Sequence, residues 1–163
     1  MQREDGTTAR VLLGAVGCVL LLAGWAGSAL AACTHAITLT ETQQINFAKI
    51  GPIPAGGTVT MSSAGTLTAT SGFFLTGTPA VGSFTASGTT AAKNCAVVIS
   101  FTAGKLTGPG TAMTISNFTD NAGASPKFNA SGTLTFNVGA ELTVNHNQAG
   151  GTYAGTYTVT VVY

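Results

Sequence analysis

From Ala32 onward, the chain consists of short runs in which apolar and hydroxyl-bearing side chains alternate, with glycine between the runs. The clearest run is residues 156–163, and every second position in it is aromatic or aliphatic: Tyr157, Val159, Val161 and Tyr163. Successive side chains of a β-strand point to opposite faces, so these four residues share one face and the threonines between them share the other. We therefore predict a C-terminal core strand whose outer face carries hydroxyl groups instead of charges.

The same alternation predicts further strands along the chain. They are residues 36–40, 45–47, 58–61 and 66–68, a short run around Phe84, and residues 113–118 and 133–138. Residues 96–101 are more continuously apolar, which predicts a buried central strand. Residues 105–110 and 120–129 carry glycine, proline and asparagine and predict loops. Short strands joined by glycine-rich turns predict one all-β domain over residues 32–163, an antiparallel β-sandwich.

The first 31 residues predict a secretory signal peptide. A polar, weakly positive start is followed by an uncharged apolar run over residues 11–26 and then by small residues. Residues 29–31 fit a cleavage site, which gives a mature chain beginning at Ala32. A membrane anchor is the alternative, but a bilayer-spanning helix needs about 20 apolar residues. We expect export to the periplasm, the cell surface or an extracellular fibre.

Cys33 has two interpretations. Removal of the leader takes Cys18 away and leaves Cys33 and Cys95, and an even pair in an exported protein predicts one disulfide. Residues 30–33, Leu-Ala-Ala-Cys, also resemble the lipobox of bacterial lipoproteins, in which Cys33 would become the lipidated first residue. Apart from the leader, such a lipid would be the chain's one attachment to a membrane. Both interpretations remain open from the sequence.

The composition excludes several classes of function. The net charge is +1 and only 7% of the residues are charged, so no basic surface is available for nucleic acid. After the leader, the acidic side chains are Glu41, Asp120 and Glu141, and the histidines are His35 and His146. These residues are far apart in sequence, whereas a zinc site needs three or four ligands and glycoside hydrolysis needs paired carboxylates. We predict no catalytic residues, no cofactor and no metal site.

Three parts of the chain resemble one bacterial secreted family. Residues 38–50 resemble its "LNFGxI" opening, residues 56–60 its "GGTVTVS" strand, and residues 133–144 with 151–163 its closing "NVGATLTV…AGTYTGTYTVTVNY". This is the domain of unknown function 4402 family, and the likeness covers essentially all of residues 38–163. Ala48 stands where the opening usually has glycine. The resemblance therefore does not guarantee a special backbone angle at that position.

The family in turn is similar to spore-coat-U-like proteins and archaic chaperone–usher pilins. The resemblance implies an immunoglobulin-like, pilin-like sandwich that lacks a strand, and a non-catalytic, adhesin-type subunit of a cell surface, pilus or fibre. Such subunits associate by strand complementation, in which a strand from another protein fills the groove. The implied partners are other copies or homologous subunits, a periplasmic chaperone and an outer-membrane usher.

Alternatives follow from the short segment before the first predicted strand. Residues 32–36 are few for a donor arm, so a self-complete secreted sandwich or a Cys33-anchored lipoprotein remains open. A carbohydrate-binding module is a further alternative, because exposed aromatic side chains can form a platform for sugars. The candidates for such a platform are Phe73, Phe74, Phe128 and Tyr153.

Overall fold

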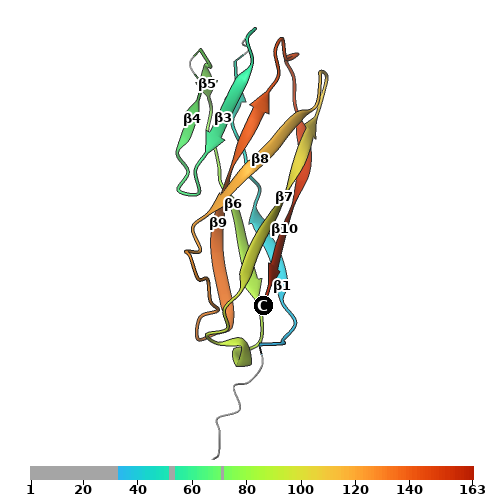
Figure 1. Cartoon of the computed structure of the whole chain (residues 1–163). Coiled ribbons are helices and arrows are strands. Elements are labelled where there is room, and N and C mark those ends of the chain that lie inside the picture. Colours follow the sequence, from blue (N-terminus) through green and yellow to red (C-terminus); the bar gives the residue numbers. More distant parts are fainter. Residues whose placement is uncertain (1–32, 52–53, 71) are drawn as a thin grey trace, which may run out of the picture. The chain divides into compact units, whose positions relative to one another are not determined.

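The computed structural model describes residues 33–51, 54–70 and 72–163, so the expected leader lies outside the described part. Cys33–Tyr163 forms one unit, and its described residues form strands and a short 3-10 turn, which confirms the all-β class (Figure 1). The elements in chain order are β1 (Thr38–Gln43), β2 (Lys49–Ile50), β3 (Gly57–Met61), β4 (Leu67–Ala69), β5 (Leu75–Thr76), β6 (Gly82–Ser87), η1 (Thr90–Ala92), β7 (Val98–Thr107), β8 (Met113–Asp120), β9 (Thr133–Val144) and β10 (Ala154–Val162).

The main sheet follows the order β1-β6-β9-β8-β7-β10, and every pairing in it is antiparallel. The long strand β9 changes partner along its length: its first half pairs with β6 and its second half with β3, which also pairs with β4. A separate ladder joins β2 to β5. Side chains of β6 and β9 pack against those of β7 and β10, so the sheet folds over into an antiparallel sandwich of the immunoglobulin-like kind.

The core between the two layers is mainly aromatic and aliphatic. Phe136 on β9 is 1% exposed and stacks on Phe84 of β6, with ring centroids 5.7 Å apart. On β10, alternate residues starting at Tyr157 pack against the core, whereas Thr156, Thr158 and Thr160 are exposed. Tyr163 follows β10 and packs on Phe128 with ring centroids 6.0 Å apart. The period of two in the sequence therefore places the C-terminal run as the core-facing strand expected from it.

The strand expected at residues 96–101 is central, because β7 pairs with both β8 and β10, but the expectation that it is buried is wrong. Strand β7 begins at Val98, which is 59% exposed, and its burial alternates along its length. One face of β7 is covered by the core and the other by no described element, so the apolar run gives a half-buried strand. The loop predicted at residues 105–110 is also too long, because β7 continues to Thr107. Lys105 there pairs with both Thr114 and Thr156.

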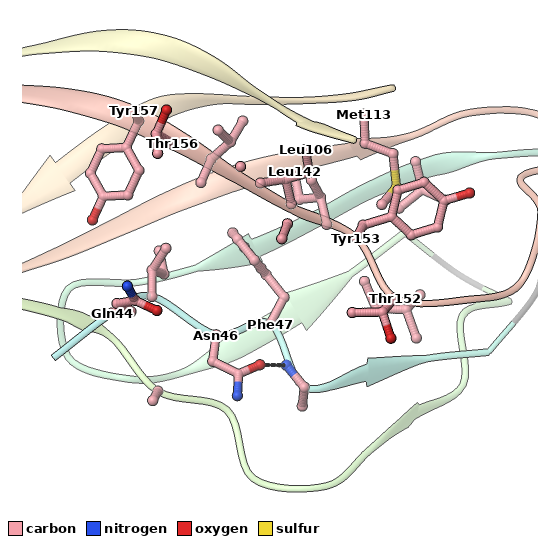
Figure 2. A pocket seen from close by; sticks show the side chains of 18 of the residues that line it. Gln44, Asn46, Phe47, Leu106, Met113, Leu142, Thr152, Tyr153, Thr156 and Tyr157 are labelled. Carbon is pink, nitrogen blue, oxygen red and sulfur yellow. Dashed lines mark hydrogen bonds between the residues drawn. The ribbon is translucent and has the colours of Figure 1, made fainter. Parts of the chain in front are cut away.

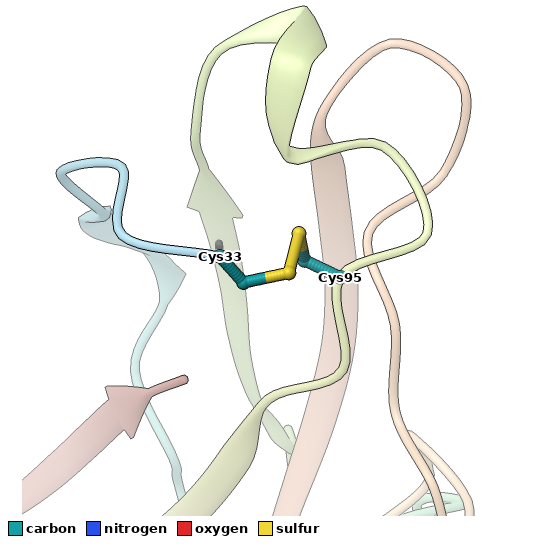
Figure 3. The surroundings of a disulfide bond; sticks show 2 residues. All are labelled: Cys33 and Cys95. Atoms are coloured by element: carbon teal, nitrogen blue, oxygen red, sulfur yellow. A yellow bond between two sulfur atoms is a disulfide. The ribbon is translucent and has the colours of Figure 1, made fainter. Parts of the chain in front are cut away.

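The predicted disulfide between Cys33 and Cys95 is present, with Cα atoms 5.8 Å apart (Figure 3). It joins the segment before β1 to the segment before β7, and these strands belong to opposite layers. A sulfur in this bond cannot also carry a lipid, so the disulfide and lipobox interpretations of Cys33 exclude each other. Along the described ranges, no helix is long and apolar enough to cross a bilayer.

Candidate functional site

Strands β1 and β10 are the two ends of the strand order. Among the described residues, β1 forms a ladder only with β6, and β10 only with β7. Successive antiparallel pairings from β1 through to β10 leave these two strands running in opposite directions. Each therefore presents one row of backbone N–H and C=O groups without a ladder partner, which is the usual state of an edge strand.

A groove of about 1020 Å³ lies between these two edges (Figure 2). Residues 39–51, from β1 through β2, contribute one side, and residues 148–159, up to the middle of β10, contribute the other. Phe47 points into it from the first side. The floor consists of side chains that belong to the core: Phe84, Leu106, Met113, Ile115, Leu142 and Val144. The groove therefore opens the hydrophobic core of the sandwich between two unpaired strand edges.

The groove ends toward the disulfide. Its lining stops at Leu39 on β1 and at Val159 on β10. Beyond these residues, Ile37 and Val161 pack against the buried cluster around Cys95. The two edges are thus closed over by side chains near the disulfide and remain apart toward β2 and the β9–β10 loop.

Both edge ladders contain an irregularity. The register of β1 against β6 shifts between Glu41 and Gln43, and that of β10 against β7 shifts between Thr156 and Thr158. The extra residue lies on β1 itself in the first ladder and on β7, the partner of β10, in the second. An extra residue twists its strand and interrupts the regular ladder, and on an edge strand it is a common protection against non-specific pairing. Both irregular positions lie along the groove, and of the two edges that border it β1 carries the bulge itself.

Two ionisable groups of the groove lie close to its apolar floor. Glu41 pairs with Phe84, and Phe84 points into the core, so the Glu41 side chain is on the core side of β1. The Tyr157 hydroxyl is buried without a hydrogen-bond partner. Burial, and secondly the negative charge of Glu41, raise the pKa of Tyr157 to about 12.

Tyr153 at the other end of the groove has a structural function. Its hydroxyl accepts hydrogen bonds from Gly110 N (2.8 Å) and from Gln148 Nε2 (2.6 Å), and it donates one to the carbonyl of Ala149 (2.9 Å). These bonds tie the β7–β8 turn to the loop that leads into β10. This side of the groove is therefore fixed before any ligand binds.

The comparisons with known proteins identify the family. The model of a domain of unknown function (DUF4402) matches residues 37–163. The chain belongs to this family. Its sequence motifs had indicated the same family, so that resemblance is confirmed. Neither a curated protein nor a solved structure matches the chain.

The DUF4402 opening keeps its special backbone angle even though this chain has alanine there. Ala48 has φ of +59°, in the left-handed region that favours glycine. Its backbone N–H donates to Asn46 Oδ1 at 2.8 Å, the bond drawn dashed in Figure 2. The predicted strand at residues 45–47 is wrong because the chain turns here, and Asn46 makes only an isolated bridge to Ala80. This turn sends Phe47 into the groove.

The structure does not bring the candidate chemical residues together. Glu141 accepts a hydrogen bond from Asn117 Nδ2 at 3.0 Å, and Asp120 accepts one from the backbone of Ala122 at 2.9 Å. His146 is exposed, whereas Nδ1 of His35 is buried without a partner. Within the described ranges, no three His, Cys, Asp or Glu side chains gather as metal ligands do.

The aromatic residues considered for a sugar platform are also dispersed. Phe128 is buried beside Cys95, and Phe73 packs against the larger core cluster. Phe74 is 72% exposed, and Tyr153 is half-buried in its hydrogen-bonded corner. The groove was not predictable from these candidates. The signal that could have found its polar pair is the alternation of β1, which places Glu41 on the face of Leu39.

Proposed function

We propose that this protein is a non-catalytic, adhesin-type structural subunit of a bacterial cell surface or pilus-like fibre. The groove between β1 and β10 accepts an extended strand from another copy or from a homologous subunit. The observation that carries this proposal is the coincidence of two unpaired, oppositely directed edges with an opened hydrophobic core. An inserted strand bonds to both edges through its backbone and fills the groove with alternate side chains.

The chemistry of the groove favours a strand over a compact apolar ligand. An apolar ligand covers Leu106, Met113 and Leu142 but leaves the backbone groups of β1 and β10 without partners. Buried backbone groups without partners are unfavourable, by about 1–3 kcal/mol each. A strand satisfies them, and each large apolar side chain that it buries contributes about 1.5–3 kcal/mol.

Export and assembly complete the proposal. A disulfide is characteristic of oxidising compartments such as the periplasm or the cell exterior, and Cys33–Cys95 is compatible with them. An unfilled groove with an apolar floor promotes aggregation. A periplasmic chaperone would cover the groove until an outer-membrane usher exchanges it for the strand of a subunit.

The test is whether copies associate through the groove. The chain isolated from producing cells is examined by sedimentation and on unboiled SDS gels, where strand-exchanged copies give resistant ladders. Gln44 is exposed and lines the groove, so Gln44→Trp places a bulky ring there (Figure 2). Thr40 lies on the outer face of the same segment, and Thr40→Trp is the matched control.

We expect ladders from the wild type and from Thr40→Trp, and none from Gln44→Trp. A wild-type chain that sediments as a strict monomer removes the proposal of association between copies. Ladders of equal strength from both tryptophan variants place the association elsewhere than in the groove.

A further inference from the structure

The groove contains one acidic side chain at a position that should be apolar. In the β1–β6 ladder, Leu39 pairs with Ala86 and Glu41 pairs with Phe84. Ala86 and Phe84 are both buried, and paired residues of two strands point to the same face. Glu41 therefore occupies the core-facing position next to Leu39 and lines the groove, with its carboxylate exposed while the groove is open.

The Tyr157 hydroxyl lies near this carboxylate. The Tyr157 ring contacts Phe84 edge-on, with centroids 6.4 Å apart, and Phe84 is the ladder partner of Glu41. A side chain on Gly82 would come within 2.7 Å of the hydroxyl oxygen, so glycine there leaves the space that the hydroxyl occupies. The carboxylate also contributes to the raised pKa of the phenol, which agrees with their proximity. Figure 2 shows Tyr157 pointing from β10 toward the segment that carries Gln44.

The described residues leave this pair without a cation. Lys49 is the one basic residue among those that line the groove, and it is exposed on β2. Within the described ranges, no salt bridge involves Glu41, and the Tyr157 hydroxyl has no partner. A strand that fills the groove covers the exposed carboxylate, which lies near the phenol oxygen that is already buried. Covering an unpaired carboxylate is strongly unfavourable, whereas covering one that meets an opposite charge is not.

We propose that Glu41 and Tyr157 form a subsite for one basic side chain, lysine or arginine, of the strand that enters the groove. The inserted strand then has apolar side chains at alternate positions and a single basic residue where it passes between Glu41 and Tyr157. The cation pairs with the exposed carboxylate, and the Tyr157 ring turns to offer its buried oxygen as a second acceptor. This inference rests on the proposed function and adds the chemistry by which the groove selects its strand.

A different role for Glu41 makes the opposite prediction. A charge that points inward from an edge strand can simply discourage every strand from pairing there. In that case the carboxylate weakens the binding of all strands, and its removal strengthens binding without any preference for charge. The two roles are therefore separated by the response of binding to a single residue in the incoming strand.

The experiment measures the binding of fluorescein-labelled synthetic peptides to the full disulfide-bonded chain by fluorescence anisotropy. Each peptide has eleven residues, with valine and threonine alternating. A lysine replaces one valine, and it is moved from valine to valine through the set. A matched set carries glutamine in place of lysine. The variants are Glu41→Gln and Tyr157→Phe, with Glu141→Gln as a control because that carboxylate bonds to Asn117 outside the groove lining.

At one position of the lysine, we expect about tenfold tighter binding than for the glutamine peptide, because close opposite charges at an interface couple strongly. Glu41→Gln should abolish this preference, Tyr157→Phe should reduce it, and Glu141→Gln should leave it unchanged. The preference should also weaken as salt is added.

The outcomes separate this inference from the function on which it rests. Equal binding of the lysine and glutamine peptides to the wild type, or a preference that survives Glu41→Gln, overturns the basic subsite and leaves the groove as a strand acceptor. Tighter binding of every peptide to Glu41→Gln supports the repulsive role instead and also overturns the subsite. Binding of neither set to the wild type, or binding unaffected by Gln44→Trp, overturns the proposed function itself.

Discussion

Removal of the disulfide should cost the domain much of its stability. The bond joins residues 62 apart in sequence, and in the denatured chain it closes a loop of that length. On the chain-entropy model, closing such a loop stabilises the folded state by about 4 kcal/mol. The whole stability of a domain is typically about 5–15 kcal/mol, so the chain without the bond should be marginal.

The measurement is urea unfolding followed by circular dichroism at a concentration where the protein is monomeric. With a urea m-value of about 1–2 kcal/mol/M, the loss corresponds to a midpoint lower by about 2–4 M. Cys33→Ala/Cys95→Ala removes the bond but also leaves a small cavity, because Cys95 is buried beside Phe128. Wild-type protein reduced with a phosphine keeps both sulfur atoms, so it isolates the effect of the cross-link.

The reduced protein tests whether the disulfide stabilises the domain through loop closure. Its midpoint should fall nearly as far as that of the double alanine variant, since the loop closure is lost in both. A fall of less than about 0.5 M refutes the entropic account, because it means that the denatured chain is little restrained by the bond. A large fall in the alanine variant alone would assign the loss to the cavity around Cys95.

Two further predictions concern the groove. Ala48→Gly should leave the free energy of unfolding unchanged or raise it by up to about 1 kcal/mol, because glycine adopts the left-handed φ without strain but makes the unfolded chain more flexible. Ala48→Val should lower the free energy of unfolding by more than about 1 kcal/mol, because a branched side chain is strained at this φ. Urea midpoints of the two variants and the wild type test both expectations. The pKa of Tyr157 is raised to about 12, so its phenol keeps its proton in the folded state at pH values where the unfolded chain loses it. The contribution of Tyr157 to the free energy of unfolding is therefore fully present below pH 10 and is lost as the pH rises toward 12. Tyr157→Phe should flatten this decline when unfolding is measured between pH 9 and 12.

The fold class was predictable because the period of two is repeated in nearly every segment. Val59 and Met61 alternate with threonine in β3 and are buried, as the pattern requires. The pattern misled where apolar residues are consecutive. At the start of β7, Val97 precedes the strand and is buried, whereas the adjacent Val98 is exposed, so the run looked buried on both faces although one face is open. Hydrophobicity alone does not tell whether a second layer covers a strand.

The groove could not be predicted, because it depends on which strands are neighbours. Glu41 and Tyr157 are over a hundred residues apart, and they meet only because β1 and β10 are the two ends of the strand order. The sequence offered half of the signal. Alternation from Leu39 places Glu41 on the core face, but an acidic residue next to a predicted strand also suits an exposed turn. The other half, the expectation of a sandwich that lacks a strand, came from the resemblance to pilins.

Because the chain carries few charges, its exposed faces offer little by which to select a partner strand. Many β proteins protect their edges with lysine, but here only 7% of the residues are charged. The outer faces of the ladders carry hydroxyl groups, such as Thr38 opposite Ser87 and Thr85 opposite Thr135. Such faces are alike from strand to strand and cannot distinguish one partner strand from another. If the groove accepts a strand as proposed, discrimination arises inside it, where Glu41 supplies the charge that the incoming strand matches.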